Sequence, residues 1–259
     1  MSNVVVRLFD DWAELSLNRP DQRNCFDAGM ISELITAFAD LAKQSQLRYV
    51  LLQGLGAHFS AGADLEWMRR MASSSEEENV EDARQLAQLF RSFYNFPAPT
   101  IVRVQGAAMG GALGLVACAD TVVASNQARF SLSELRLGLA PAVISPYLHQ
   151  AIGPRALAHL ALSARVFDAS EAWHYGLIHR LVSPEQLDDA ITQECSYLRQ
   201  TAPQASRACK QWLRSLAPAP DFVCEEKTVE LIARLRIAPE GQEGINAFFA
   251  HQYPSWQDE

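Results

Sequence analysis

The sequence lacks the short motifs by which several common enzyme classes are recognised. It contains no G-x-x-x-x-G-K-[ST], no G-x-G-x-x-G, no G-x-S-x-G and no H-E-x-x-H. These absences argue against nucleotide hydrolysis, dinucleotide redox chemistry and serine-esterase chemistry. The five cysteines are odd in number and include no CxxC pair, so we expect neither a disulfide framework nor a zinc knuckle.

Positive charge and long apolar runs are also scarce. There are 22 Lys plus Arg residues against 30 Asp plus Glu, which gives a formal net charge of −8 and disfavours nucleic acid and anionic membranes as partners. The first twenty residues contain no apolar run long enough for a signal peptide or a membrane span. We therefore expect a cytoplasmic protein with no nucleic-acid or membrane partner.

The 259 residues, 49% of them apolar, suffice for one domain with a terminal appendage. β-rich and helical patterns alternate, which predicts an α/β fold. The expected elements are a hairpin (4–8 and 13–17), a helix from 27 to 41, strands at 49–52 and 100–104, and a helix at 80–96. The Ser/Glu run at 73–78 is predicted to be a mobile lid. Helical patterns dominate from 184 onward, so we expect a core at 1–190 and a helical subdomain at 191–259.

Two glycine-bearing segments, HFSAGADL at 58–65 and QGAAMGGALG at 105–114, each follow a predicted strand and open a helix. Glycine lets a ligand approach the backbone closely, and free N–H groups at a helix start attract an oxygen. Two such ends could bind one oxyanion. The alternative interpretation is that Gly110, Gly111 and Gly114 only allow an apolar helix to pack tightly.

Four ordered segments resemble the signatures of the crotonase (enoyl-CoA hydratase/isomerase) superfamily. They are LNRPDQRNCFD at 17–27, FSAGADL at 59–65, GAAMGGALGLVACAD at 106–120 and ARFSLSELRLGLAP at 128–141. The resemblance implies a spiral of strand–strand–helix turns at 1–190 that holds an acyl-CoA site. It also implies that 191–259 form a helical trimerisation subdomain, and that the protein assembles as a homotrimer or homohexamer.

The resemblance assigns the catalytic residues. The backbone N–H groups of Ala63 and Gly111 would bind the thioester oxygen as enolate charge develops, which requires no metal and no cofactor beyond the coenzyme A of the substrate. Hydratases of the family carry two glutamates, and this sequence keeps only the second, Glu134, with Gly114 at the position of the first. A single carboxylate suits a proton shuttle between carbons, as in the enoyl-CoA isomerases.

A finer resemblance is to a bacterial branch of methylglutaconyl-CoA and isohexenylglutaconyl-CoA hydratases. It rests on FSAGADLEWMRRM, GGALGLVACAD, SELRLGLAPAVISPYL and RIAPEGQEGINAFF. That branch commonly lacks the first glutamate, and our hypothesis is that the second carboxylate of its substrates helps to order the water. The family's GAGGT stretch is replaced by AVISP at 142–146, which should reshape the acyl pocket.

These observations favour hydration of a methylglutaconyl-CoA-like thioester. The alternatives are a Δ3-Δ2 enoyl-CoA isomerase that uses Glu134 alone, and a noncatalytic acyl-CoA- or RNA-binding protein. Trp67 and Met68 sit at core-packing spacings on a helix that, by the resemblance, also borders the acyl pocket. Arg19 and Arg23 could meet the phosphates of coenzyme A, or only water. The expected substrate-binding residues are Ala61, Gly62, Asp64, Trp67, Met68, Gly110, Gly114 and Arg23.

Overall fold

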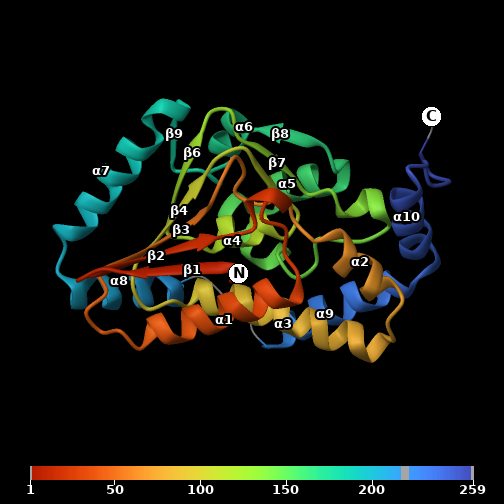
Figure 1. Ribbon diagram of the computed structural model, residues 1–259, viewed down its shortest axis with the longest axis horizontal. Helices are drawn as coiled ribbons and strands as arrows, with labels where there is room; N and C mark the ends of the chain where they lie inside the picture. Colours follow the sequence, from red (N-terminus) through yellow and green to blue (C-terminus); the bar gives the residue numbers. More distant parts are fainter. Residues whose placement is uncertain (1, 217–221, 258–259) are drawn as a thin grey trace.

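A six-stranded sheet forms the centre of the computed structural model, which describes residues 2–216 and 222–257 (Figure 1). The strand order is β1 (Val4–Leu8), β2 (Trp12–Leu17), β3 (Tyr49–Gly54), β4 (Thr100–Val104), β6 (Thr121–Ser125) and β9 (Arg180–Val182). β1 and β2 are antiparallel, with Val4 opposite Leu17, and the other neighbours are parallel. The predicted hairpin and α/β fold are confirmed.

One face of this sheet is covered by α1 (Ala28–Ala42) and α3 (Glu76–Tyr94). α1 begins where the Asp27 carboxylate accepts a hydrogen bond from the Met30 N–H at 2.7 Å, which satisfies a donor that a helix start leaves free. The rings of Phe38 and Phe93 stack at a centroid distance of 4.8 Å and join the two helices. The predicted apolar spacing therefore marks a buried helix face.

The opposite face of the sheet packs on α7 (Leu187–Arg199), which follows the short helix η3 (Pro184–Gln186). Strand residues such as Leu51 and Val123 contact Leu187 and Ile191 there. The subdomain boundary expected at residue 191 thus falls inside a helix that is packed on the sheet. The core described by the structure includes all of α7.

A second, three-stranded sheet lies beside the first and joins the loops that follow its strands. It contains β5 (Ala107–Met109), β7 (Arg129–Ser131) and β8 (Val166–Asp168). β5 leads directly into α4 (Ala112–Cys118), and β7 leads into the short helix η2 (Glu134–Leu137). The remaining elements are η1 (Pro20–Gln22), α2 (Leu65–Ala72), α5 (Ser145–Ser163) and α6 (Ala169–His174). Both glycine-bearing segments therefore meet near this small sheet.

The Ser/Glu run at 73–78, predicted from the sequence to be a mobile lid, joins α2 to α3: Ser75 is the N-cap of α3, and Glu76 to Glu78 form its first turn. The Ser75 hydroxyl accepts from the Glu78 N–H, and the Glu78 carboxylate accepts from the Ser75 N–H at 2.8 Å. This reciprocal capping box satisfies two donors at the helix start. The acidic side chains that suggested a mobile segment also complement the positive end of the helix dipole.

Three helices complete the described chain: α8 (Pro203–Leu216), α9 (Phe222–Ile237) and α10 (Pro239–Ala250). α8 is tied to the core because Lys210 and Arg214 both bind the Asp120 carboxylate. α9 runs along α3, and α10 lies against α2 and η2 (Figure 1). The fit is close, since a Cβ added to Gly244 would lie 2.5 Å from the Leu137 backbone. The predicted helical C-terminal region is confirmed, and α9 and α10 fold over the chain's own core.

None of the described helices is both long and apolar enough to span a membrane.

Candidate active site

Backbone hydrogen bonds join three loops that are far apart in the sequence. Ser60 donates to the Ala107 carbonyl at 3.0 Å and accepts from Met109 at 3.1 Å. On the other side of the same loop, Phe26 donates to the Gly62 carbonyl and accepts from the Asp64 N–H, both at 2.7 Å. The two glycine-bearing segments predicted to act together therefore lie side by side.

Two backbone N–H groups in these loops, those of Ala63 and Gly111, form no hydrogen bond among the described residues. Phe26 bonds to the residues on either side of Ala63, so the Ala63 N–H takes no part in the bridge. Gly111 stands at the start of α4, where a helix leaves its first N–H groups unsatisfied. Within the described part of the chain, neither N–H donates to a protein acceptor. Gly110, by contrast, donates to the Ser131 carbonyl at 2.9 Å.

Arg19 fixes the same loops through side chains. Its guanidinium binds Asp27 at 2.8 Å and Asp64 at 3.0 Å. Each of these carboxylates also caps a helix, α1 and α2 respectively. Arg19 is therefore occupied within the fold, and its ion pairs set the positions of the two helix starts that flank Ala63.

Glu134 lies in η2 beside these loops, on the wall of a cavity of about 460 Å³. A Cβ added to Gly110 would lie 3.3 Å from Glu134 Oε1, so only glycine leaves the carboxylate its full space. Oε2 is buried and has no hydrogen-bond partner among the described residues. Burial raises the pKa of this carboxyl group to about 7, because desolvation disfavours the charged form. Near neutral pH both forms are populated, as proton transfer in both directions requires.

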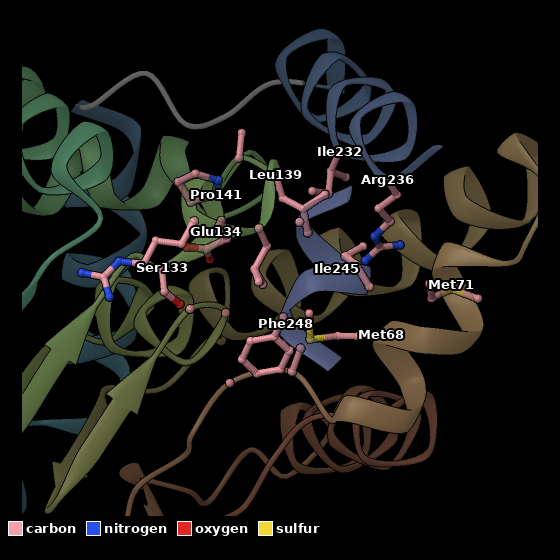
Figure 2. Close-up of a pocket in the computed structure, with 18 of the residues that line it drawn as sticks. Met68, Met71, Ser133, Glu134, Leu139, Pro141, Ile232, Arg236, Ile245 and Phe248 are labelled. Atoms are coloured by element: carbon pink, nitrogen blue, oxygen red, sulfur yellow. The ribbon is translucent and has the colours of Figure 1, made fainter. Parts of the chain in front are cut away.

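Most of the predicted site residues meet at this cavity. Its lining includes Ala61, Gly62, Ala63, Trp67, Met68, Gly110, Gly111 and Glu134. Apolar side chains of several elements complete the wall, as Figure 2 shows for Met68, Met71, Leu139, Ile232, Ile245 and Phe248. Glu134 is the only carboxylate among the described lining residues. The arrangement can bind an oxygen at two N–H groups and move a proton nearby.

Three predicted substrate-binding residues lie outside the cavity lining. Asp64 caps α2 and pairs with Arg19. Arg23 is exposed in a left-handed turn with φ of 51°. Gly114 is buried inside α4, where an added Cβ would lie 2.5 Å from both Phe90 and Ile144. These two side chains fill the space where the family's first glutamate would project.

Sequence reasoning missed the far wall of the cavity, which comes from the last helices. Ile232 and Arg236 belong to α9, and Ile245 and Phe248 to α10. The signal that could have indicated it was the similarity of the segment RIAPEGQEGINAFF at 236–249 to the hydratase branch. No cluster of three His, Cys, Asp or Glu side chains among the described residues could hold a metal ion.

Comparison with known proteins gives the same assignment as this geometry. Residues 11–259 match the family model described as enoyl-CoA hydratase/isomerase. The chain belongs to the enoyl-CoA hydratase/isomerase family. A solved enoyl-CoA hydratase from Shewanella pealeana is 43% identical, with a TM-score of 0.81 over 98% of this chain and 96% of that one.

Members with different reactions also match over most of their length. The 2,3-dehydroadipyl-CoA hydratase of Escherichia coli is 28% identical over 99% of both chains. The trans-2-decenoyl-[acyl-carrier-protein] isomerase of Streptococcus mutans is 26% identical over 94% of both. The protein is thus an enzyme of the enoyl-CoA hydratase/isomerase type with the crotonase fold.

Replacing Gly111 tests whether its N–H group acts as an oxyanion donor. Gly111→Pro deletes the N–H, and the φ of −52° at this position already suits proline. We expect kcat on an acyl-CoA substrate to fall about 10²–10³-fold, the usual effect of losing one such donor. Gly111→Ala is the matched control, because its Cβ would lie an ordinary 3.7 Å from Phe26 and the N–H remains. Equal kcat for the two folded variants would exclude Gly111 as a donor.

Replacing Gly114 tests whether the first glutamate could be restored. Gly114→Glu must displace Phe90 or Ile144, so we expect the free energy of unfolding to fall by about 1–3 kcal/mol, as in other overpacked cores. Hydration activity should not rise. Urea unfolding and a hydration assay measure the two effects. A variant with wild-type stability and faster hydration would show that this space is open to a carboxylate.

The pKa of Glu134 predicts a pH-dependent cost in stability. The unfolded chain loses this proton near pH 4.5, whereas the folded protein keeps it to about pH 7. Stability should therefore fall as the pH rises between these values, by up to about 3 kcal/mol at 1.36 kcal/mol per pKa unit. Urea unfolding should find Glu134→Gln more stable than wild type at pH 8 by up to this amount, and by less at pH 5. Glu66→Gln, on the exposed start of α2, is the control. A Glu134→Gln difference that does not change with pH would contradict the raised pKa.

Proposed function

We propose that the protein hydrates an α,β-unsaturated acyl-CoA thioester, with a methylglutaconyl-CoA-like compound as the substrate. The observation that carries the proposal is the Glu134 carboxyl, with its buried and unpartnered Oε2 and a pKa of about 7, on the same cavity as the free N–H groups of Ala63 and Gly111. The coenzyme A is part of the substrate, and the mechanism uses no further cofactor.

The two N–H groups act on the thioester carbonyl. Its oxygen accepts from Ala63 and Gly111, and these bonds strengthen as the oxygen gains charge. Because backbone fixes both donors, they need no reorganisation during the reaction. The polarised thioester makes the β-carbon of the conjugated double bond electrophilic.

Glu134 moves the proton. Its carboxylate takes a proton from water as the water oxygen bonds to the β-carbon, and the double-bond electrons shift to the thioester enolate. The protonated carboxyl then returns the proton to the α-carbon, and the carbonyl re-forms. The product is the 3-hydroxyacyl thioester, and the carboxylate is regenerated. One carboxylate with a pKa near the working pH can do both steps.

A Δ3-Δ2 enoyl-CoA isomerase is the second candidate, and the solitary carboxylate favours it. In that reaction Glu134 removes a proton from the α-carbon of a 3-enoyl thioester and returns it to the γ-carbon, with the same enolate held by Ala63 and Gly111. The similarity to both a named isomerase and a named hydratase is compatible with either reaction. We place hydration first because the finer sequence resemblance is to hydratases that lack the first glutamate.

A substrate panel separates the two reactions. We expect glutaconyl-type 2-enoyl-CoAs to gain the mass of one water with loss of the absorbance of the conjugated thioester. Glu134→Gln should reduce this turnover by about 10²–10⁴-fold while acyl-CoA binding remains, since the amide keeps the shape and loses the base. For wild type, kcat/KM should rise as the pH passes about 7, where the carboxyl ionises. Conversion of 3-enoyl-CoAs at unchanged mass, with no hydration, would instead establish the isomerase. Wild-type turnover by Glu134→Gln would refute both mechanisms.

We further propose that the protein is a cytoplasmic homotrimer or a hexamer of two trimers. Helix α8 supports an assembly, because Trp212, Leu213 and Leu216 are each at least 58% exposed in the isolated chain. Such a cluster of large apolar side chains is typical of a contact surface.

Light scattering can test the assembly through this surface. Trp212→Glu with Leu213→Glu should shift the mass toward that of one chain, 28.7 kDa, because two charges would be buried at the contact. Lys227→Glu, at an exposed position on α9, is a control charge change on a different helix. An unchanged trimer or hexamer in the double variant would exclude α8 as the contact.

A further inference from the structure

Arg236 is a basic side chain on the wall of an otherwise mainly apolar cavity. It lies near the end of α9 and is only 9% exposed. Its Nη1 donates to Asp82 Oδ2 at 2.8 Å and to Asn79 Oδ1 at 3.2 Å, both on α3. Asp82 Oδ1 is also occupied, since it accepts from Trp67 Nε1 at 2.8 Å. These contacts fix the guanidinium in one orientation.

The other edge of the guanidinium remains available. Nη1 uses both of its hydrogens on α3, and within the described chain no acceptor binds Nε or Nη2. These atoms are not among the fully buried unpartnered polar atoms of the described residues, so they keep some exposed surface, and Arg236 lines the cavity. Nε and Nη2 carry two parallel N–H groups, the geometry that binds a carboxylate with two hydrogen bonds.

The position of Arg236 indicates which end of a substrate it would meet. Glu134 lies beside Gly110, which precedes the proposed oxyanion donor Gly111, so the thioester end of a substrate belongs there. In Figure 2, Arg236 and Glu134 lie on opposite sides of the cavity, with Arg236 next to Ile245. Arg236 therefore faces the far end of an acyl group. A carboxylate bound there would anchor the acyl group and would not order the water beside Glu134.

We propose that Arg236 is a specificity-determining residue that binds a carboxylate at the far end of the acyl group. The substrate class is then an unsaturated dicarboxylic acyl group on coenzyme A. This deepens the proposed function and rests on it for the location of the thioester. The Asp82 and Asn79 contacts hold the guanidinium so that its Nε and Nη2 edge is already oriented before the substrate arrives.

Binding of saturated thioesters tests the subsite without any catalytic step. Calorimetry with adipyl-CoA and hexanoyl-CoA compares a terminal carboxylate with a terminal methyl at equal chain length, and glutaryl-CoA with pentanoyl-CoA repeats the comparison one carbon shorter. Wild type should prefer at least one diacid ligand over its methyl partner. Arg236→Met should weaken that ligand at least about tenfold, as expected for loss of hydrogen bonds to a charged group. Binding of the methyl-terminated partner should change less than about threefold.

Two variants separate recognition from structural damage. Arg236→Met alone leaves Asp82 without its cation, which can destabilise the wall. The double variant Arg236→Met with Asp82→Asn leaves no unpaired charge, and it should fold yet show no diacid preference. Asp82→Asn alone keeps the guanidinium and should keep the preference. Arg236→Lys should retain only part of it, because lysine has no two-pronged edge.

These experiments test the carboxylate subsite at Arg236 separately from the proposed hydration reaction. Absence of diacid preference in wild type, an equal loss for both ligands in Arg236→Met, or a preference that survives in the folded double variant would each overturn the subsite. Hydration of 2-enoyl-CoAs would stand in all three cases. A diacid preference that depends on Arg236, in a protein that adds no water to any 2-enoyl-CoA, would keep the subsite and reject the hydratase.

Discussion

The site depends on which backbone groups the three loops use to hold one another. In the bridge between Phe26 and Ala63, Phe26 bonds only to Gly62 and Asp64. Residues along an extended chain point their N–H groups alternately to either side, so the Ala63 N–H must face away from Phe26. A shift of one residue in this bridge would use up the Ala63 N–H and leave a neighbour free. The Arg19 ion pairs with Asp27 and Asp64 oppose such a shift.

The raised pKa of Glu134 comes from the surroundings in which the fold places its carboxyl group. Oε2 has no donor among the described residues, and apolar side chains such as Leu139 and Ile144 share its cavity. Burial outweighs the backbone hydrogen bond that lowers the pKa of this group, and a donor at Oε2 or a nearby cation would lower the pKa further. The carboxyl group instead has a pKa of about 7. Its burial lowers the stability of the fold above this pH, whereas an exposed glutamate has no such cost. A strained or costly group in an otherwise well-packed core is typical of a site selected for reaction.

The sequence allowed the fold and the centre of the candidate site to be predicted because both depend on local motifs. FSAGADL leads from two isolated β-bridges into the start of α2, and GAAMGGALG leads from β5 into the start of α4, each within a few residues. Arg236 could not be assigned in the same way, since its orientation depends on Asn79 and Asp82, more than 150 residues earlier. The filling of the space at Gly114 depends likewise on Phe90 in α3 and on Ile144, the N-cap residue of α5. At Ser75 the polar composition suggested a mobile segment, although the same residues form a capping box.

The two walls of the cavity come from separate stretches of the chain. Glu134 and the loops that carry the free Ala63 and Gly111 N–H groups lie between residues 60 and 134, whereas the opposite wall is contributed by residues 232–257. Changes in the last helices can therefore reshape one wall of the cavity while the candidate reacting groups on the other wall stay intact. Recombination near residue 200 would exchange one wall for another within a family of this fold. Such a division allows a single mechanism to be inherited by enzymes that serve different carbon skeletons.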